Sequence, residues 1–149
     1  MKRLDIYGKE AILSTVIRPE VSRRNKYWIS RHRYYELKHF CMQYKEYKKE
    51  LNNLNDFEAN HISEYVDCSN VSNKTEQLAI LRTSYSKRIE IIETAAKKTD
   101  EYFSDMILRS VTTGVSYPKL KARYNVPCSK DYWYKMYRKY FFILSKLRD

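Results

Sequence analysis

Glycine and proline are scarce in this chain, which has two glycines and three prolines among its 149 residues. An all-β fold needs many turns built from these two residue types, so their scarcity argues against such a fold. Gly8 and Gly114 cannot build a glycine-rich phosphate-binding loop. No apolar run approaches the roughly 18 residues of a membrane-spanning helix. These absences predict an all-α protein with no membrane segment.

Cysteine and histidine are also few, and neither forms a metal-binding pattern. Cys41, Cys68 and Cys128 lie far apart, with no CxxC pair and no Cys/His spacing typical of zinc. The sequence lacks an HExxH motif and an EF-hand loop. We therefore expect no cofactor and no enzymatic activity, although a nuclease site built from dispersed acids would leave no such signature. The absence of a signal peptide predicts an intracellular protein with reduced thiols.

Positive charge is abundant and unevenly distributed. The formal net charge is +11, of which residues 1–50 contribute +7, residues 51–99 contribute −1 and residues 100–149 contribute +5. Two basic ends around a neutral middle are expected when both ends face a polyanion. The alternative is a generally basic protein surface without a dedicated partner.

Apolar residues recur at steps of three and four over residues 34–54 and again over residues 73–98. This spacing predicts two long helices. Helices of similar length joined by a medium loop most simply pack as an antiparallel hairpin. The same apolar faces could instead pair with a second copy of the chain, in a homodimer. A third helix is predicted over residues 101–111, between a capping Asp100 and Gly114.

Residues 116–148 combine nine Lys or Arg with nine aromatic residues and a single acid, Asp131. Ser116 can cap a short helix that Pro127 then prevents from continuing. Ser129 can cap a second, longer helix. A short helix, a turn and a long basic helix form a helix-turn-helix pattern. We therefore predict a basic N-terminal arm (1–33), a helical hairpin (34–99) and a three-helix DNA-binding unit (100–149).

The last helix is expected to bury one face and expose the other. The predicted core of the C-terminal unit gathers apolar residues from its three helices: Phe103, Ile107, Leu120, Tyr124, Val126, Trp133, Met136, Tyr137 and Tyr140. Residues 140–144 are apolar around the whole helix circumference, which favours burial over groove insertion. We expect this half of the helix to dock on the hairpin or on a partner chain.

The exposed face of the same unit supplies the predicted contacts with double-stranded DNA. A recognition helix reads bases with its first turns and meets phosphate further along. Lys130, Tyr134 and Lys135 are the base-side candidates. Phosphates are expected to meet Lys139 and three residues of the preceding helix, Lys119, Lys121 and Arg123, while Arg138 suits either role. Tyr134 could instead close the core from its edge.

The N-terminal arm carries a second group of basic residues, interleaved with Tyr27 and Trp28. Such a segment can lie along phosphates or enter a minor groove. The alternative is a solvated basic loop with Trp28 buried in the core. The basic residues of this segment are Arg23, Arg24, Lys26, Arg31 and Arg33.

Four stretches of the chain resemble small proteins encoded by phages and prophages of low-GC Gram-positive bacteria. They are residues 34–44 (YYELKHFCMQY), 87–95 (KRIEIIETA), 111–117 (VTTGVSY) and 127–132 (PCSKDY). The resemblance covers the chain from about residue 22 onward. The layout is similar to that of phage transcriptional regulators of the RinA and ArpU type, whose C-terminal helix-turn-helix resembles the promoter-reading region of sigma factors.

This resemblance implies control of phage gene expression in the cytoplasm of a bacterial host cell, with RNA polymerase as a protein partner. The chain departs from the usual helix-turn-helix spacing, because Pro127 and Cys128 come between Val126 and the capping Ser129. That departure favours a second hypothesis, in which the protein binds and inhibits a host defence protein such as a CRISPR nuclease. Tyr and Arg, both abundant here, are enriched at protein-binding hot spots.

Overall fold

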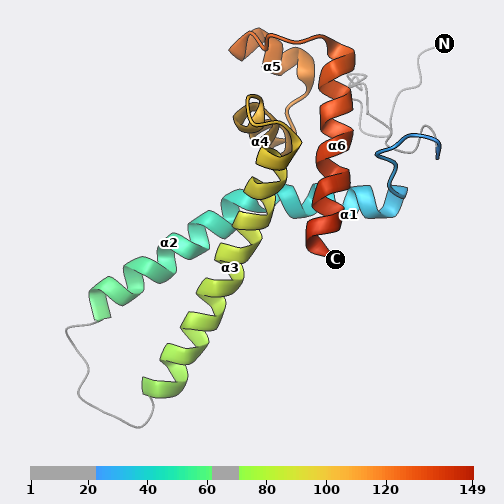
Figure 1. The fold of residues 1–149 in the computed structure, drawn as a ribbon. Coiled ribbons are helices and arrows are strands. Elements are labelled where there is room, and N and C mark those ends of the chain that lie inside the picture. The colour runs from blue at the N-terminus through green and yellow to red at the C-terminus, as the bar shows by residue number, and fades with distance from the viewer. Residues whose placement is uncertain (1–22, 62–70) are drawn as a thin grey trace, which may run out of the picture.

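The computed structural model describes residues 23–61 and 71–149, which form six helices and, over these residues, no strand. The predicted all-α class is confirmed. The first 22 residues of the predicted arm, and Cys68, lie outside the described residues. In chain order (Figure 1) the helices are α1 (Arg31–Met42), α2 (Tyr44–His61), α3 (Val71–Thr99), α4 (Ser104–Thr113), α5 (Tyr117–Tyr124) and α6 (Lys130–Arg148).

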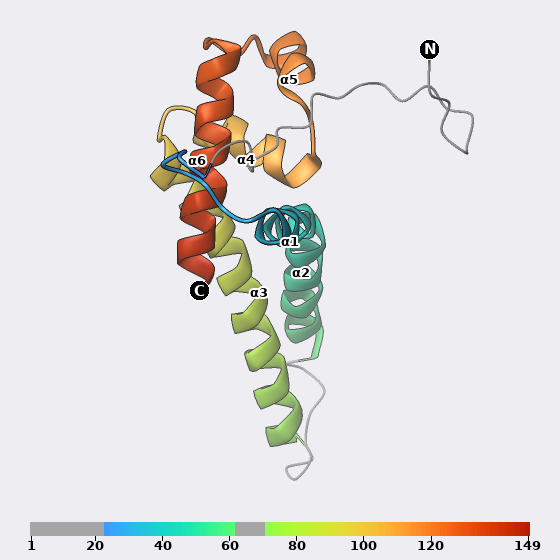
Figure 2. The same ribbon diagram turned by 90° about the vertical axis from the view of Figure 1, so that its right-hand side faces the viewer.

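Helices α2 and α3 lie side by side and run in opposite directions (Figures 1 and 2). At one end, the Tyr44 hydroxyl of α2 donates to the carboxylate of Glu93 in α3. Further along α2, the Leu54 carbonyl accepts from Arg82 Nη2 at 3.4 Å. The residue numbers rise in α2 as they fall in α3, so the pair is antiparallel within one chain.

The single helix predicted over residues 34–54 is wrong, because the chain forms two helices separated at Gln43. No proline or glycine marks this break, and the apolar spacing continues through it. The two helices pack against different partners: Phe40 and Cys41 of α1 belong to the core beside α4 and α6, while Tyr44 and Tyr47 of α2 face α3. One straight helix could not present its apolar face in both directions.

Helix α2 also continues past its predicted end, to His61. The prediction rested on the low helix propensity of the asparagines at positions 52, 53 and 55, each of which costs only about 0.5 kcal/mol. Leu51 and Leu54 are half-buried on the same helix. Packing against α3 outweighs such small local preferences.

Helix α6 crosses the fold antiparallel to α3 and closes the core (Figure 1). Lys139 in the middle of α6 reaches Thr99 at the end of α3. Tyr140 donates to the carbonyl of Ile92, about two turns earlier in α3, at 3.5 Å. Helix α1 packs on α6 as well: the rings of Tyr34 and Phe141 are 4.9 Å apart, edge to face. The prediction that the second half of this helix docks on the hairpin is confirmed.

One hydrophobic cluster joins all six helices. Its largest fully buried side chains are Trp133, Tyr140, Phe141, Leu37, Ile92, Ile107, Leu120 and Leu144. The predicted boundary at residue 100 therefore does not separate two cores, because α6 shares its buried face with α1 and α3. Of the core predicted for residues 100–149, one residue is wrong: Tyr124 is 44% exposed at the end of α5. Tyr137 is half-buried and the other seven are buried.

The ends of α4 follow the sequence signals with a small shift. Asp100 Oδ1 accepts from the Phe103 N–H at 3.1 Å, which stabilises a turn, and α4 itself begins at Ser104. Gly114 ends α4 in the left-handed region, at φ 69°, as predicted.

Two isoleucines of α3 allow a direct test of this packing. Ile92 is fully buried, whereas Ile80 is 61% exposed. Ile92→Ala is expected to lower the free energy of unfolding by about 2–5 kcal/mol, because it removes buried methyl groups and leaves a cavity. Ile80→Ala is expected to change it by less than about 0.5 kcal/mol. Urea unfolding of both variants measures the difference, and equal losses would contradict the packing described.

Alkaline pH is expected to destabilise the fold through Cys41. Burial raises the pKa of this thiol from its ordinary 9.0 to about 12. The folded state therefore holds the proton over a pH range in which the unfolded state releases it. The contribution of this thiol to the free energy of unfolding is fully present below pH 9. It falls as the pH rises from 9 towards 12, by up to about 1.4 kcal/mol per pH unit.

The measurement is the free energy of unfolding at several pH values between 8 and 11, for the natural chain and for Cys41→Ala. The variant is expected to show a shallower decline. Its remaining decline includes the contributions of Tyr137 and Tyr140, whose pKa values burial raises well above 10.0. Parallel curves for the two proteins would rule out Cys41 as the cause.

Candidate nucleic-acid interface

Three predicted phosphate contacts project from α5 into solvent. This helix starts after Ser116, whose backbone is extended, and has Pro118 in its first turn. Tyr117 and Leu120 are buried and fix which face of α5 points inward. Lys119, Lys121 and Arg123 are consequently exposed, and α5 contains no acidic residue.

The turn between α5 and α6 is held by buried contacts. Asn125 adopts the left-handed conformation, φ 46°, and its N–H donates to the Lys121 carbonyl. Val126 is buried, with 2% of its surface exposed. The Tyr117 hydroxyl donates to the carbonyl of Cys128 at 2.6 Å. The turn that contains Pro127 and Cys128 is therefore anchored to Tyr117, the first residue of α5, and this contact holds α5 and α6 together.

Helix α6 begins with two of its base-side candidates exposed. Ser129 Oγ accepts from the Tyr132 N–H at 3.3 Å, as expected of a capping residue. Lys130 and Lys135 are exposed. Tyr134 is half-buried: its ring lies 6.3 Å from that of Tyr117, and Lys130 Nζ lies 5.8 Å from its centroid. Burial, and then the nearby Tyr117, raise the pKa of Tyr134. Tyr134 thus closes the edge of the core and borders the basic surface at the same time.

Lys139 is engaged within the chain. Its Nζ donates to the backbone carbonyl of Thr99 at 2.7 Å. Thr99 is the last residue of α3, where carbonyls lack helical partners and the helix dipole favours a cation. Lys139 therefore caps α3 from α6. Arg138, its neighbour, is half-buried.

The arm residues meet α6 one turn beyond Arg138. The ring of Tyr27 lies 5.8 Å from that of Phe142, which follows Arg138 by four residues and so shares its face of the helix. Arg23 lies 5.9 Å from the ring of Trp28, and Lys26 lies 5.7 Å from that of Tyr27. Trp28 is half-buried, whereas Arg23, Arg24 and Lys26 are exposed. The arm thus combines an aromatic anchor with an exposed basic surface.

The other two arginines of the predicted arm belong to the start of α1. Arg33 is engaged internally: its Nε donates to Ser145 Oγ at 3.2 Å, and it pairs with Glu36 at 3.0 Å and with Asp149. Arg33 therefore ties α1 to the end of α6. Arg31 is exposed, with its guanidinium 5.9 Å from the ring of Tyr35.

Arg109 of α4 is a basic residue of this region that the sequence did not indicate. It is exposed, its guanidinium lies 5.1 Å from the ring of Tyr124, and its Nη1 donates to the Tyr124 hydroxyl at 3.2 Å. Arg109 thus adds positive charge beside the last residue of α5. The 15 residues that separate the pair in sequence give no periodic signal that could have revealed it.

Comparison of the chain with protein-family models, curated proteins and solved structures finds no match. Among the described residues, no cluster of three or more His, Cys, Asp or Glu could hold a metal ion. No helix in residues 23–61 or 71–149 is both long and apolar enough to cross a membrane.

Lys135 and Lys139, one turn apart on α6, are expected to have different roles. Lys139→Ala is expected to lower the free energy of unfolding by about 1.5–3 kcal/mol, because it removes a hydrogen bond to a charged group at the end of α3. Lys135→Ala removes an exposed charge and is expected to change stability by less than about 0.5 kcal/mol. Chemical unfolding of the two variants under the same conditions separates these roles. Equal stabilities would mean that Lys139 does not cap α3.

Proposed function

We propose that the protein is a phage-encoded, sequence-specific regulator of transcription that binds double-stranded DNA through α5 and the first half of α6. One observation carries the proposal. Five basic side chains on these consecutive helices are exposed, and within the described part of the chain none of them forms an ion pair. They are Lys119, Lys121, Arg123, Lys130 and Lys135.

Uncompensated positive charge of this density destabilises the isolated protein through mutual repulsion. Duplex DNA relieves that repulsion, because it carries one negative charge per about 1.7 Å of its axis and releases bound counterions when lysine or arginine neutralises its phosphates. Asp131 is the single acid on α5 and α6 before the final residue of the chain. Asp131 lies in the first turn of α6, where its carboxylate stabilises the positive N-terminal end of the helix dipole.

The arrangement supports a division of roles among the candidates. The major groove is wide enough to admit one helix, and a recognition helix meets base edges with its N-terminal turns. Lys130, Tyr134 and Lys135 occupy those turns of α6. Lys119, Lys121 and Arg123 on α5 then hold phosphates, as Arg109 can from α4. Lys139 and Arg33 do not contact DNA in this proposal, since both are engaged within the chain.

The arm extends the same surface. Lys26 Nζ lies over the ring of Tyr27, which packs against Phe142, so the basic arm joins the outer face of α6 beyond Arg138. An arm of this composition can follow the backbone or enter the adjacent minor groove. The regulatory role, with RNA polymerase as a partner, rests on the resemblance to RinA and ArpU regulators.

Binding to a random DNA duplex at about 50 mM salt is expected to weaken steeply as salt is added, since each phosphate contact contributes about −0.9 to the slope of log K against log salt. Replacing Lys119, Lys121 and Arg123 by alanine is expected to reduce that slope by about 3 and to weaken binding at every salt concentration. Fluorescence anisotropy of a labelled duplex measures both quantities.

The control carries the same change in net charge elsewhere: Lys45, Lys49 and Lys74, all exposed on the α2–α3 hairpin, are replaced by alanine. It is expected to keep most of the affinity. Equal losses in the two triple variants would show that only net charge matters, and no binding by the natural chain would overturn the proposal. Selection from a randomised duplex library tests specificity, because a regulator enriches one shared sequence.

A second candidate function, binding of a host defence protein, has one observation in its favour. Tyr102 is 77% exposed and Tyr132 is 44% exposed, and both rings pack against that of the buried Phe103. Exposed tyrosines on a buried aromatic support resemble a protein-binding hot spot. Co-purification of a host nuclease that survives digestion of DNA, and that is lost on Tyr102→Ala, would favour this function.

A further inference from the structure

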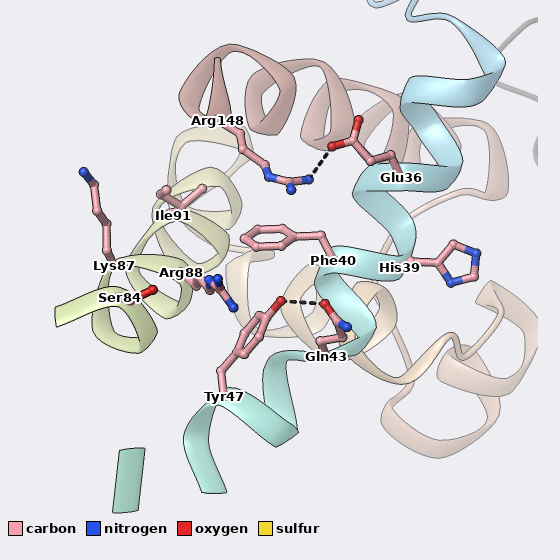
Figure 3. Close-up of a pocket in the computed structure, with 10 residues that line it drawn as sticks. All are labelled: Glu36, His39, Phe40, Gln43, Tyr47, Ser84, Lys87, Arg88, Ile91 and Arg148. Carbon is pink, nitrogen blue, oxygen red and sulfur yellow. Dashed lines mark hydrogen bonds and ion pairs between the residues drawn. The ribbon is translucent and has the colours of Figure 1, made fainter. Parts of the chain in front are cut away.

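A pocket of about 530 Å³ opens between α1, α2, α3 and the last turn of α6. It lies far from the candidate DNA interface: between Lys135 and Arg148, α6 advances by about 20 Å. Its volume is within the usual range for small-molecule sites, roughly 300–1,000 Å³. Figure 3 shows the side chains that line it.

Two aromatic rings, tilted by 51° to one another, form the floor of the pocket. Phe40 and Tyr47 are both buried, and their ring centroids are 5.8 Å apart. Each ring carries a guanidinium group: Arg148 Cζ lies 4.2 Å from the Phe40 centroid, and Arg88 Cζ lies 5.2 Å from the Tyr47 centroid. A guanidinium donates hydrogen bonds in its own plane, so contact with the face of a ring positions these groups without itself consuming their donors.

Positive charge in the pocket exceeds negative charge. Glu36 is the single carboxylate that lines it, and this group is shared between Arg148, at 2.9 Å, and Arg33, at 3.0 Å. Arg88 and Lys87 form no ion pair with any residue that the structure describes. The pocket therefore holds a surplus of cationic donors.

The neutral groups add donors too. The Tyr47 hydroxyl donates to Gln43 Oε1 at 2.6 Å, which leaves the amide nitrogen of Gln43 as a donor. Burial raises the pKa of Tyr47, while Arg88 and then Arg148 act in the opposite direction, so both guanidinium groups influence the same phenol oxygen. Two arginines, a lysine and an amide thus surround one space with hydrogen-bond donors.

We infer that this pocket binds the phosphate group of a small molecule. Phosphate matches a site rich in guanidinium donors because several of its oxygens accept at once and arginine pairs with them bidentately. The volume leaves room for an organic group beyond the phosphate, and the arginine planes can stack on a flat one. A mononucleotide combines these features. Free phosphate shares the same recognition chemistry.

Isothermal titration of the full chain with adenosine 5′-monophosphate, inorganic phosphate and adenosine tests the inference. The nucleotide is expected to bind and adenosine to bind at least about tenfold more weakly, because adenosine lacks the charged group. Tighter binding of the nucleotide than of inorganic phosphate identifies an organic phosphate as the ligand class. Equal binding of these two identifies free phosphate. Equal binding of adenosine and the nucleotide, or no binding by either phosphate compound, overturns the inference.

Arg88→Gln is expected to weaken nucleotide binding at least about tenfold. Arg109→Gln is the matched control, because Arg109 also stacks on a tyrosine but lies outside the pocket. Equal weakening in both variants would indicate adsorption to a basic surface and would overturn the inference. Arg88 is exposed, so the variant is expected to fold, which its unfolding curve checks. Lys87→Gln, at the rim of the same pocket, provides a second variant with the same expected direction.

This inference does not depend on the proposed DNA binding. Arg88→Gln is expected to keep its affinity for duplex DNA, since Arg88 lies on α3 and not on α5 or the first half of α6. Loss of nucleotide binding with intact DNA binding separates the two sites. If Arg88→Gln lowered the affinities for the nucleotide and for duplex DNA together, the inference of a separate phosphate-binding pocket would be overturned.

Discussion

The hydroxyl group of Tyr140 lies where α1, α3 and α6 meet, and the remaining helices are arranged around that junction. Tyr140 is fully buried, its hydroxyl is 3.3 Å from Cys41 Sγ, and it donates to the Ile92 carbonyl. A buried hydroxyl without a hydrogen-bond partner would destabilise the fold by about 1–3 kcal/mol. These contacts fix how far α6 can slide along α3. The direction in which α6 leaves the core towards α5 follows from that register.

Burial of one face of α6 explains why its other face is available for binding. Trp133, Met136, Tyr140 and Leu144 point into the core, so Lys135, Arg138 and Phe142 point outward. The same helix ends at Arg148, which lines the pocket between α1 and α3. One rigid element therefore connects the two proposed binding regions at its opposite ends.

Periodicity and capping residues were sufficient to predict the helical class, α3, the end of α4, both basic helices and the inner face of α6. These features depend on local spacing and on single residues such as Gly114 and Ser129. The break at Gln43 could not be predicted, because nothing in the local sequence marks it; it arises from packing against different helices. Tyr124 fits the helical spacing of the core residues. It is, however, the last residue of α5, and its hydroxyl accepts a hydrogen bond from Arg109 at the surface.

The basic residues show the same limit. Lysines and arginines at exposed helical positions look alike in sequence, and only tertiary contacts distinguish Lys139, which caps α3, from Lys135, which faces solvent. The sequence predicted Arg33 to be part of a basic arm. Its partners Ser145 and Asp149 lie more than a hundred positions from it in the sequence, so no local pattern indicates them. Charge patterns therefore indicated which regions of the chain are basic, whereas the contacts of single residues could be assigned only from the fold.

The half of the α2–α3 hairpin that lies away from the core contains fewer buried side chains than the rest of the structure. Between positions 48 and 57 of α2, and between positions 73 and 88 of α3, no described side chain is buried. Local opening costs little free energy where few apolar contacts must be broken. Amide hydrogens in these turns can therefore exchange with solvent through fraying of the two helices. The junction around Tyr140 meanwhile stays closed, so stability rises along the hairpin towards the core.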